Sequence, residues 1–408
     1  MNNNYDIIII GGGAAGFFAA INAAEINPKL KIIILERGKN VLEKVRISGG
    51  GRCNVTHACF TPKELSKFYP RGEKELLGPF HTFCSGDTVE WFENRGVELK
   101  IEDDNRMFPT SNSSQTIVDC FAKLVKKHRI EVRTSARVDS ILPPNEKNKT
   151  WKITAQGVDY QANKLVVAAG SNPSFWQMLA KLGHNIITPV PSLFTFNIKD
   201  KRITDLLGLS VEKVTTEISE LRQRAEGPLL ITHWGMSGPG ILRLSAWAAR
   251  ELHDLKYSFT LKINWLHLKN FSETKEEIDV LKIRLSKKDV FTYCPFGLPL
   301  RLWKRLCEAA NVRENQNWAD LNKGQIKDLA MQLIDCQFKV NGKSTFKEEF
   351  VTAGGVDLKE IDFKRFESKI HKNLHIIGEC LDIDAITGGF NFQAAWTGGY
   401  LVAKAIAE

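Results

Sequence analysis

Three glycines near the start of the chain have the spacing of a dinucleotide-binding turn. Gly11, Gly13 and Gly16 follow a strand predicted over Tyr5–Gly11, and they open a helix of small and apolar residues that reaches about Asn27. In such a turn the first glycine allows the tight bend, the second lets a pyrophosphate approach, and the third permits close packing of the helix on the strand. We therefore expect a nucleotide site at this turn.

A carboxylate follows the next predicted strand. That strand covers Lys31–Leu35 and ends in Glu36, which lies about 20 residues after Gly16, where an acid binds the hydroxyls of an adenosine ribose. Because the same carboxylate would repel a 2′-phosphate, the pattern indicates FAD or NAD rather than NADP. The alternative is an ordinary βαβ unit without a ligand, but strand, glycines, helix, strand and acid occur here in the expected order.

A second glycine-rich segment favours a flavin over a nicotinamide cofactor. It directly follows the first βαβ unit, and its N–H groups suit a second portion of a ligand. A nicotinamide dehydrogenase would continue with another βαβ repeat, whereas residues 56–79 are predicted to be irregular. The alternative, a mobile surface turn, does not explain the basic and amide side chains beside the glycines. The candidate cofactor residues in this segment are Arg46, Ser48, Gly50, Arg52 and Asn54.

Glycines also precede the last predicted helix. After a strand predicted over Leu374–Gly378, the pair Gly388 and Gly389 opens a helix of small residues that runs through Ala407. The N–H groups and positive dipole end of such a helix would stabilise the N1/O2 edge of a flavin, which becomes negative on reduction.

The elements between these two ends follow the order of a known flavoprotein class. We predict a helix over 114–127, strands over 131–141 and 151–155, and a strand over 162–169 that ends at Gly170. Together with the flanking glycine motifs, this order resembles the α/β glutathione-reductase-like FAD-binding Rossmann fold.

The joint motif set resembles a bacterial family. GGGAAG, ISGGGRCN, GPLLITHWGMSGPGIL, VTAGGVDL and GECLDIDAITGGFNFQAAWTGG look like the aminoacetone oxidase-like or BaiN-like NAD(P)/FAD-dependent oxidoreductases, over essentially the whole chain. The resemblance implies bound FAD in a discontinuous domain over 1–190 and 346–408. It also implies an inserted β-barrel-like domain over 191–345, with a small helical part at about 272–335.

The resemblance also implies which side chains line the cofactor and what the enzyme does. It implies either amine oxidation or reduction of a conjugated C=C bond, with NAD(P)H as a transient donor because no second dinucleotide fingerprint is visible. The family's PSLVPL segment is PSLFTF at 191–196, and the two phenylalanines are expected to reshape the substrate side. The residues expected to line the FAD are Ala15, Glu36, Ser48, Asn54, Val138, Glu379 and the segment from Asp384 to Asn391, which includes Phe390.

The predicted insert has strand patterns followed by helical ones. Alternating residues predict strands over 193–198, 214–220 and 256–265, and Asn341-Gly342 predicts a hairpin between 338–340 and 344–346. The charged stretch 272–289 is typical of a solvated helix or a linker, and 298–311 and 318–335 are predicted amphipathic helices.

One histidine of the insert is a candidate catalytic residue. His233 lies in THWGMSGPG, where Pro239 is expected in the first turn of a helix. Histidine titrates near neutral pH, so His233 would act as an acid/base or as a substrate anchor. The alternative is a turn histidine whose ring bonds only to neighbouring backbone.

Composition limits the remaining possibilities. The chain has 408 residues, a formal net charge of +9 and eight scattered cysteines without CxxC or zinc-ligand spacing. We expect a cytoplasmic enzyme with a small-molecule substrate, no metal, no membrane segment and no nucleic-acid partner; oligomeric state stays open. Two alternatives remain, a nucleic-acid-associated flavoprotein, which the positive charge motivates, and a flavin redox sensor that turns nothing over.

Overall fold

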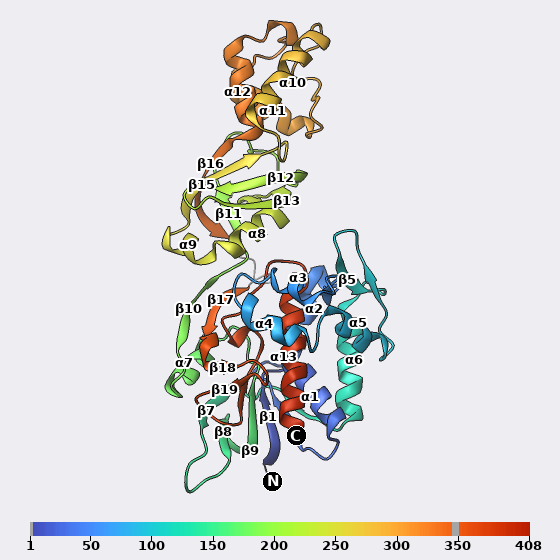
Figure 1. The fold of residues 1–408 in the computed structure, drawn as a ribbon, viewed down its shortest axis with the longest axis vertical. Helices are drawn as coiled ribbons and strands as arrows, with labels where there is room; N and C mark the ends of the chain where they lie inside the picture. The colour runs from blue at the N-terminus through green and yellow to red at the C-terminus, as the bar shows by residue number, and fades with distance from the viewer. Residues whose placement is uncertain (1–2, 345–350) are drawn as a thin grey trace. The chain divides into compact units, whose positions relative to one another are not determined.

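The computed structural model describes residues 3–344 and 351–408, which divide into two compact units. Unit 1 comprises residues 1–190 and 351–408, and unit 2 comprises residues 191–350 (Figure 1). The predicted boundary between residues 345 and 346 lies outside the described residues.

Unit 1 begins with alternating strands and helices and continues with runs of helices and runs of strands. Its helices are α1 (Ala14–Ile26), α2 (Glu43–Gly51), α3 (Pro62–Ser66), α4 (Glu73–Phe80), α5 (Ser85–Glu93), α6 (Ser114–Lys127), α7 (Pro173–Lys181) and α13 (Phe390–Ala407). Its strands are β1 (Asn4–Ile10), β2 (Ile32–Leu35), β3 (Thr56–His57), β4 (Leu99–Ile101), β5 (Arg106–Pro109), β6 (Glu131–Arg133), β7 (Val138–Leu142), β8 (Trp151–Ala155), β9 (Val158–Val167), β10 (Ile186–Pro191), β17 (Thr352–Val356), β18 (Ile361–Asp362), β19 (Glu367–Ser368) and β20 (Leu374–Ile376).

A mixed sheet forms the centre of unit 1, and its strands β20, β9, β1, β2 and β6 are parallel. Among the described residues, nine strands form this sheet, in the order β18-β19-β20-β9-β1-β2-β6, with β7 and β8 joined through β9. Strand β1 pairs in parallel with β2 and with β9, so it is an interior strand of the sheet, and its isoleucines are fully or nearly fully buried. The predicted buried parallel strand and the Rossmann-type α/β fold are therefore confirmed.

Helices α1 and α13 run side by side along this sheet (Figure 1). Their contact is close because Gly399 has no side chain; a Cβ there would lie 3.0 Å from the Ala15 carbonyl oxygen. At the far end of α13, Lys164 and Arg365 donate to the carbonyls of Ala405 and Ile406. These two cations complement the negative end of the helix dipole. The opposite, positive end of α13 lies beside the glycine-rich Ser48–Asn54 loop, where Gly389 N–H donates to Asn54.

The stretch 56–79 is more regular than its sequence predicts. It contains β3, α3 and most of α4, all of them short; α3 begins at Pro62, and Gly72 is the N-cap of α4. Its order comes from contacts with a distant part of the chain, since the Phe68 carbonyl accepts from Ile386 N–H at 3.1 Å. The periodicity of the local sequence does not indicate such a contact.

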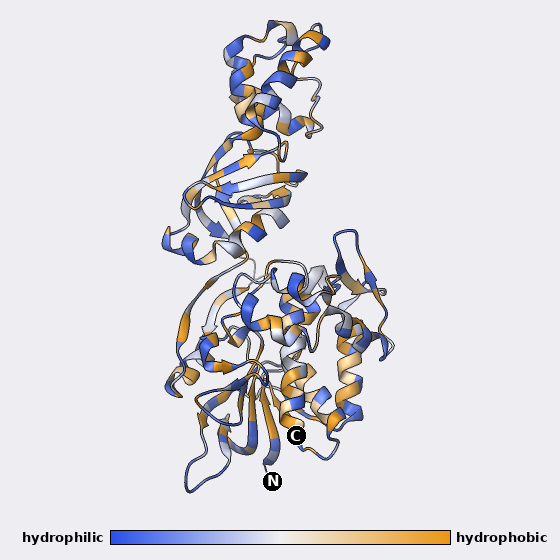
Figure 2. Cartoon of the chain, viewed as in Figure 1, coloured by the Kyte–Doolittle hydropathy of each residue, from blue (hydrophilic) through white to orange (hydrophobic). Residues whose placement is uncertain are grey.

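Unit 2 combines a closed barrel with a group of helices. The barrel order is β11 (Thr195–Ile198), β14 (Gly235–Ser237), β13 (Gln223–Ile231), β12 (Ser210–Ile218), β15 (Ser258–Asn264) and β16 (Cys336–Ser344). The helices are α8 (Pro239–Trp247), α9 (Ala249–Asp254), α10 (Phe271–Arg284), α11 (Leu300–Ala309) and α12 (Lys323–Ile334). Hydrophobic and hydrophilic residues alternate along α10, α11 and α12 (Figure 2), and their apolar faces join the barrel interior in one core.

Two expectations for unit 2 are wrong. Asn341 and Gly342 do not form a hairpin. They lie inside β16, which pairs with β15 as far as Asn341 and with β11 at Val340, Lys343 and Ser344. Gly342 has φ +95°, and glycine in this conformation lets the strand bend as the barrel closes. Phe194 and Phe196, expected on the substrate side, are 2% and 0% exposed and pack in the barrel core.

Candidate functional site

The three glycines of the first turn have the three different surroundings that a dinucleotide turn needs. Gly11 has φ +111°, and a Cβ there would lie 2.2 Å from the Ala168 carbonyl oxygen. A Cβ on Gly16 would lie 2.2 Å from the Gly11 carbonyl oxygen, whereas a Cβ on Gly13 would meet no atom within 4 Å. Gly13 is also the N-cap of α1 and has no side-chain cap, so N–H groups of the first turn face open space. This cradle fits a pyrophosphate.

Glu36 closes one side of this turn. Its carboxylate accepts from Gly12 N–H and from Gly38 N–H, each at 2.7 Å, and its backbone N–H donates to the Arg133 carbonyl. The Glu36 carbonyl accepts from Ala136 N–H at 2.8 Å, which brings the chain leading into β7 and Val138 beside the acid. The carboxylate is partly exposed, and each oxygen keeps a lone pair for a ribose hydroxyl.

The second glycine segment bends sharply at the end of α2. Ser48 leaves the helical conformation (ψ 149°), and Gly49, Gly50 and Gly51 follow with φ +58°, +68° and +82°. Side chains would strain such a run by roughly 1–2 kcal/mol per residue. A Cβ on Gly49 would meet the Phe108 ring at 2.9 Å, whereas one on Gly50 would meet nothing within 4 Å. The loop therefore has one face against β5 and one face open to a ligand.

The two arginines of this segment brace the loop. Arg52 Nη1 lies 2.5 Å from Glu102 Oε1, and its guanidinium lies 4.0 Å from the centroid of the Phe108 ring. Arg46 Nη1 donates to Gln115 Oε1 at 2.6 Å. Both guanidiniums are thus engaged with the protein itself.

Asn54 connects the loop to the start of α13. In the amide orientation that satisfies both of its groups, Asn54 donates to the Thr56 carbonyl and accepts from Gly389 N–H, each at 3.0 Å. Gly388 and Gly389 have φ +136° and +91°, and a Cβ on Gly389 would lie 2.6 Å from the Thr56 carbonyl oxygen. The two glycine segments, distant in sequence, are therefore in direct contact.

Further predicted residues meet beside the same loop. Glu379 forms an ion pair with Lys44 of α2, and a Cβ on Gly170 would lie 3.9 Å from Glu379 Oε2. Ala15 is buried in α1, and its Cβ lies 3.4 Å from the position that a Cβ on Gly378 would take. The ends of β9 and β20 thus meet the first turns of α1 and α2.

Three predicted side chains are occupied in shaping the loop before α13. Asp384 is fully buried and forms a bidentate ion pair with Arg71. Asn391 bonds through its amide to both backbone groups of Ala385. Phe390 is 1% exposed, and its ring stacks on Phe68 with centroids 4.3 Å apart.

Sequence reasoning missed the partners that hold this loop. Four of them lie in the stretch predicted to be irregular and one lies in α13, and their contacts join positions more than 300 residues apart, so no local spacing indicates them. The missed residues are His57, Phe68, Tyr69 and Arg71, together with Gln393 in α13.

His233 lies in unit 2, on the turn between β13 and β14. Thr232 N–H donates to the Gly235 carbonyl at 2.8 Å, and the turn presents His233 and Trp234 as exposed rings with centroids 5.2 Å apart. Pro239 begins α8, as predicted. The imidazole is exposed to solvent.

The cysteine beside the glycine loop is not poised for redox chemistry. Cys53 is fully buried, and burial raises the pKa of its thiol to about 12. A thiol with that pKa stays protonated near neutral pH and is a poor nucleophile. Packing is therefore the role that the structure supports for Cys53.

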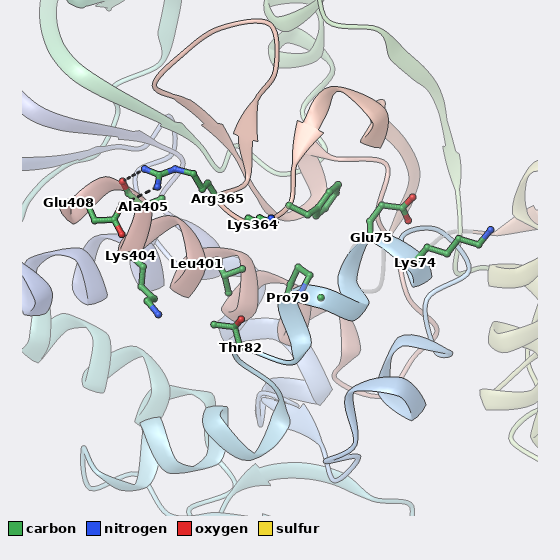
Figure 3. A pocket seen from close by; sticks show the side chains of 12 residues that line it. Lys74, Glu75, Pro79, Thr82, Lys364, Arg365, Leu401, Lys404, Ala405 and Glu408 are labelled. Atoms are coloured by element: carbon green, nitrogen blue, oxygen red, sulfur yellow. Dashed lines mark hydrogen bonds and ion pairs between the residues drawn. The ribbon is translucent and has the colours of Figure 1, made fainter.

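A hollow of about 540 Å³ lies elsewhere on unit 1 and contains none of the predicted site residues. It is lined by α4, the β18–β19 turn and the last turns of α13 (Figure 3). Within it Arg365 bonds to the Ala405 carbonyl and to the Glu408 carboxylate.

Over residues 3–344 and 351–408, no cluster of three or more His, Cys, Asp or Glu side chains is placed to hold a metal ion. No helix in the same ranges is both long and apolar enough to cross a bilayer.

Comparisons with known proteins identify relatives along the whole chain. The chain is 26% identical to a 3-dehydro-bile acid delta(4,6)-reductase of Clostridium scindens, covering 98% of both chains. It is 28% identical to a ribosomal RNA dihydrouridine synthase of Haemophilus influenzae, covering 100% of both chains. The second relative removes support for the expected absence of a nucleic-acid partner.

Solved structures share the fold at low identity. A 3-ketosteroid delta1-dehydrogenase from Sterolibacterium denitrificans matches with a TM-score of 0.52 and 12% identity, covering 100% of both chains.

The family model described as HI0933-like protein Rossmann domain matches residues 5–405. The chain therefore belongs to the HI0933-like Rossmann family, and it is an FAD-dependent oxidoreductase.

Proposed function

We propose that this protein reduces a C=C bond conjugated to a carbonyl group in a small organic substrate. The observation that carries the proposal is the chemistry shared by the two named relatives, since both names describe saturation of a ring C=C bond. In a 3-oxo steroid and in uracil alike, that bond is conjugated to a carbonyl. The amine oxidation that the sequence resemblance also implied has no such support.

The proposed FAD site is built from unit 1. We propose that the pyrophosphate lies over Gly13 at the start of α1 and that Glu36 accepts from the adenosine ribose hydroxyls. The flavin ring would lie between the open face of the Ser48–Asn54 loop and the Gly388–Gly389 pair. FAD supplies the hydride chemistry when bound, and the chain supplies position and electrostatics. The uncapped N–H groups of α13 support this placement because they would stabilise negative charge on the N1/O2 edge.

The overall reaction is balanced by a nicotinamide donor and a proton. NAD(P)H is oxidised to NAD(P)⁺, the β-carbon of the C=C bond receives the hydride, and the α-carbon receives a proton. We propose His233 as the group that provides or relays this proton, or that anchors the substrate carbonyl. We also propose that the protein is located in the reducing cytoplasm, because all eight cysteines are free thiols.

A second candidate substrate is a uracil ring within RNA. The net charge of +9 and the ribosomal RNA dihydrouridine synthases among the relatives favour it. The reaction is the same, because the C5=C6 bond of uracil is conjugated to the C4 carbonyl. The two candidates therefore differ in the molecule that contains the C=C bond, a small organic compound or an RNA, and not in the type of bond that is reduced.

The test is a panel of acceptors given to the holoenzyme under anaerobic conditions, with NADH or NADPH as donor. The arms are a cyclic 3-oxo-4-ene steroid, a ribosomal RNA transcript and aminoacetone, each followed by mass spectrometry. Gain of two hydrogens by the steroid supports the first proposal, and gain of dihydrouridine by the RNA selects the second. Consumption of aminoacetone on readmission of oxygen, with neither acceptor reduced, contradicts both, and slow flavin reduction by every donor indicates a redox sensor.

His233→Ala tests the role of the histidine. We expect unchanged FAD content and slower turnover, whereas His253→Ala, which alters another exposed histidine of unit 2, should leave both unchanged. Wild-type kinetics for His233→Ala would remove this residue from the mechanism.

A further inference from the structure

A row of contacts joins the segment after the glycine loop to the start of α13. Each of the four residues from Asn54 to His57 contacts α13 or its N-cap, so the two elements are held together along their whole junction. The contacts join Asn54 to Gly389 (3.0 Å), the Val55 carbonyl to Trp396 Nε1 (2.9 Å), Thr56 Oγ1 to Gln393 Oε1 (2.6 Å) and the His57 ring to Phe390 (centroids 4.5 Å apart).

Gln393 is the centre of the polar part of this junction. Its Oε1 accepts from Thr56 Oγ1 at 2.6 Å and from Thr88 Oγ1 at 2.9 Å, and its Nε2 donates to Thr397 Oγ1 at 3.1 Å. Thr397 Oγ1 in turn donates to the Phe83 carbonyl at 2.9 Å. The four polar side chains are fully buried. A buried amide with this many partners fixes geometry strongly, because each lost partner leaves a polar group unsatisfied.

The network lies directly behind the uncapped start of the helix. Gln393 is in the first turn of α13, whose N-cap Gly389 has no side-chain cap and whose first turn contains no acidic residue. The N–H groups there face no competing carboxylate of their own turn. Their value to a bound flavin depends on their position relative to the glycine loop, which is the relation that the network fixes.

We propose that Gln393, with Thr56 and Thr88, is a positioning residue that holds the N-terminus of α13 against the glycine loop and thereby sets the redox balance of the bound flavin. Gln393 is fully buried and acts through the backbone N–H groups rather than by touching substrate. The inference rests on the proposed placement of the flavin and goes beyond the proposed reaction, since it concerns only the relative stability of oxidised and reduced cofactor. It would stand if the substrate proved to be different.

Thr88→Val is the sharpest perturbation, because it nearly preserves shape while it removes the hydroxyl that bonds to Gln393 Oε1 (2.9 Å) and to the Cys84 carbonyl (3.2 Å). Gln393→Met removes all three side-chain hydrogen bonds of Gln393. Thr274→Val is the matched control, since Thr274 is also fully buried and its hydroxyl has no hydrogen-bond partner within the described residues. Each protein is purified with FAD, and its midpoint potential and its dissociation constant for FAD are measured.

We expect the preference for reduced over oxidised FAD to fall about tenfold in Thr88→Val, which corresponds to a midpoint potential about 30 mV more negative. Gln393→Met should shift it further in the same direction, and Thr274→Val should leave it unchanged. Retained FAD with a wild-type potential in Thr88→Val overturns the inference. If Gln393→Met fails to fold, Thr88→Val decides alone. A Thr88→Val protein that binds FAD more weakly but keeps the wild-type midpoint potential also contradicts the inference, because the network would then serve FAD binding and not the redox balance.

Discussion

Adding one methyl group at Gly13 should weaken FAD binding without weakening the fold. Gly13 has φ −94° and ψ −171°, an extended conformation open to any residue, and a Cβ there would meet no atom within 4 Å. Gly13→Ala should therefore leave the free energy of unfolding unchanged or raise it by about 0.4–1 kcal/mol, because alanine restricts the unfolded chain. The same methyl group would occupy the space proposed for the pyrophosphate.

The expected size of the effect follows from the cost of overpacking. An extra methyl group in a filled site typically costs about 1–3 kcal/mol. If that cost appears only when FAD is bound, the dissociation constant for FAD rises roughly 5- to 150-fold. Gly16→Ala should behave in the opposite way, because its Cβ would lie 2.2 Å from the Gly11 carbonyl oxygen, a backbone atom that cannot move aside. That variant should destabilise the apoprotein by about 3 kcal/mol or more.

Two measurements on the apoproteins separate these effects. Titration with FAD, followed by flavin fluorescence, gives the dissociation constant, and urea unfolding gives the free energy of unfolding. The placement of the pyrophosphate is refuted if Gly13→Ala binds FAD as tightly as the wild type. It is equally refuted if Gly13→Ala loses as much stability as Gly16→Ala.

Three further predictions concern residues that support the site. Burial lowers the pKa of His375 to about 4, so the unfolded chain binds a proton near the ordinary value of about 6.5 while the folded chain does not. Stability should thus fall by about 1.4 kcal/mol per pH unit as pH drops from about 6.5 to 4, and His375→Gln should flatten this urea-unfolding profile. Asp384→Asn leaves the Arg71 guanidinium buried without its carboxylate and should cost about 3–5 kcal/mol in unfolding free energy. Glu102→Gln removes a partly exposed partner of Arg52, so unfolding free energy should change by about 1 kcal/mol or less while FAD binding weakens severalfold.

Each of these has a contradicting result. A pH profile that is identical in the wild type and in His375→Gln would remove that histidine from acid sensitivity. If replacing Arg71 and Asp384 together by leucine costs more than Asp384→Asn alone, breaking the buried ion pair is not the cause of the loss. Wild-type FAD affinity in Glu102→Gln would show that the glycine loop keeps its shape without its brace.

The local part of the site could be predicted from the sequence. Gly11, Gly13, Gly16 and Glu36 have fixed spacing because one turn and its two flanking strands determine their positions, and the structure gives each glycine a different environment. The start of α13 was predictable for the same reason, since Gly388 and Gly389 directly precede it.

The supporting part could not be predicted. Arg71 pairs with a residue 313 positions away, and Thr56 bonds to one 337 positions away, so no periodicity brings them together. At Asn341 and Gly342 the sequence predicted a turn that does not form. Their local preference for a hairpin is overridden because β16 pairs with strands on both sides. In both cases tertiary contacts, rather than local conformational preference, determined the outcome.

The most direct test of the central claim is a single turnover of the reduced enzyme. Holoenzyme is reduced without oxygen by one equivalent of NAD(P)H, freed of donor and mixed in a stopped-flow instrument with a cyclic enone, while flavin absorbance is recorded. We expect the oxidised flavin band to return at a rate that depends on enone concentration, with one saturated product formed per flavin. A flavin that stays reduced until oxygen is admitted, in the presence of either the enone or uridine-containing RNA, would contradict the central claim.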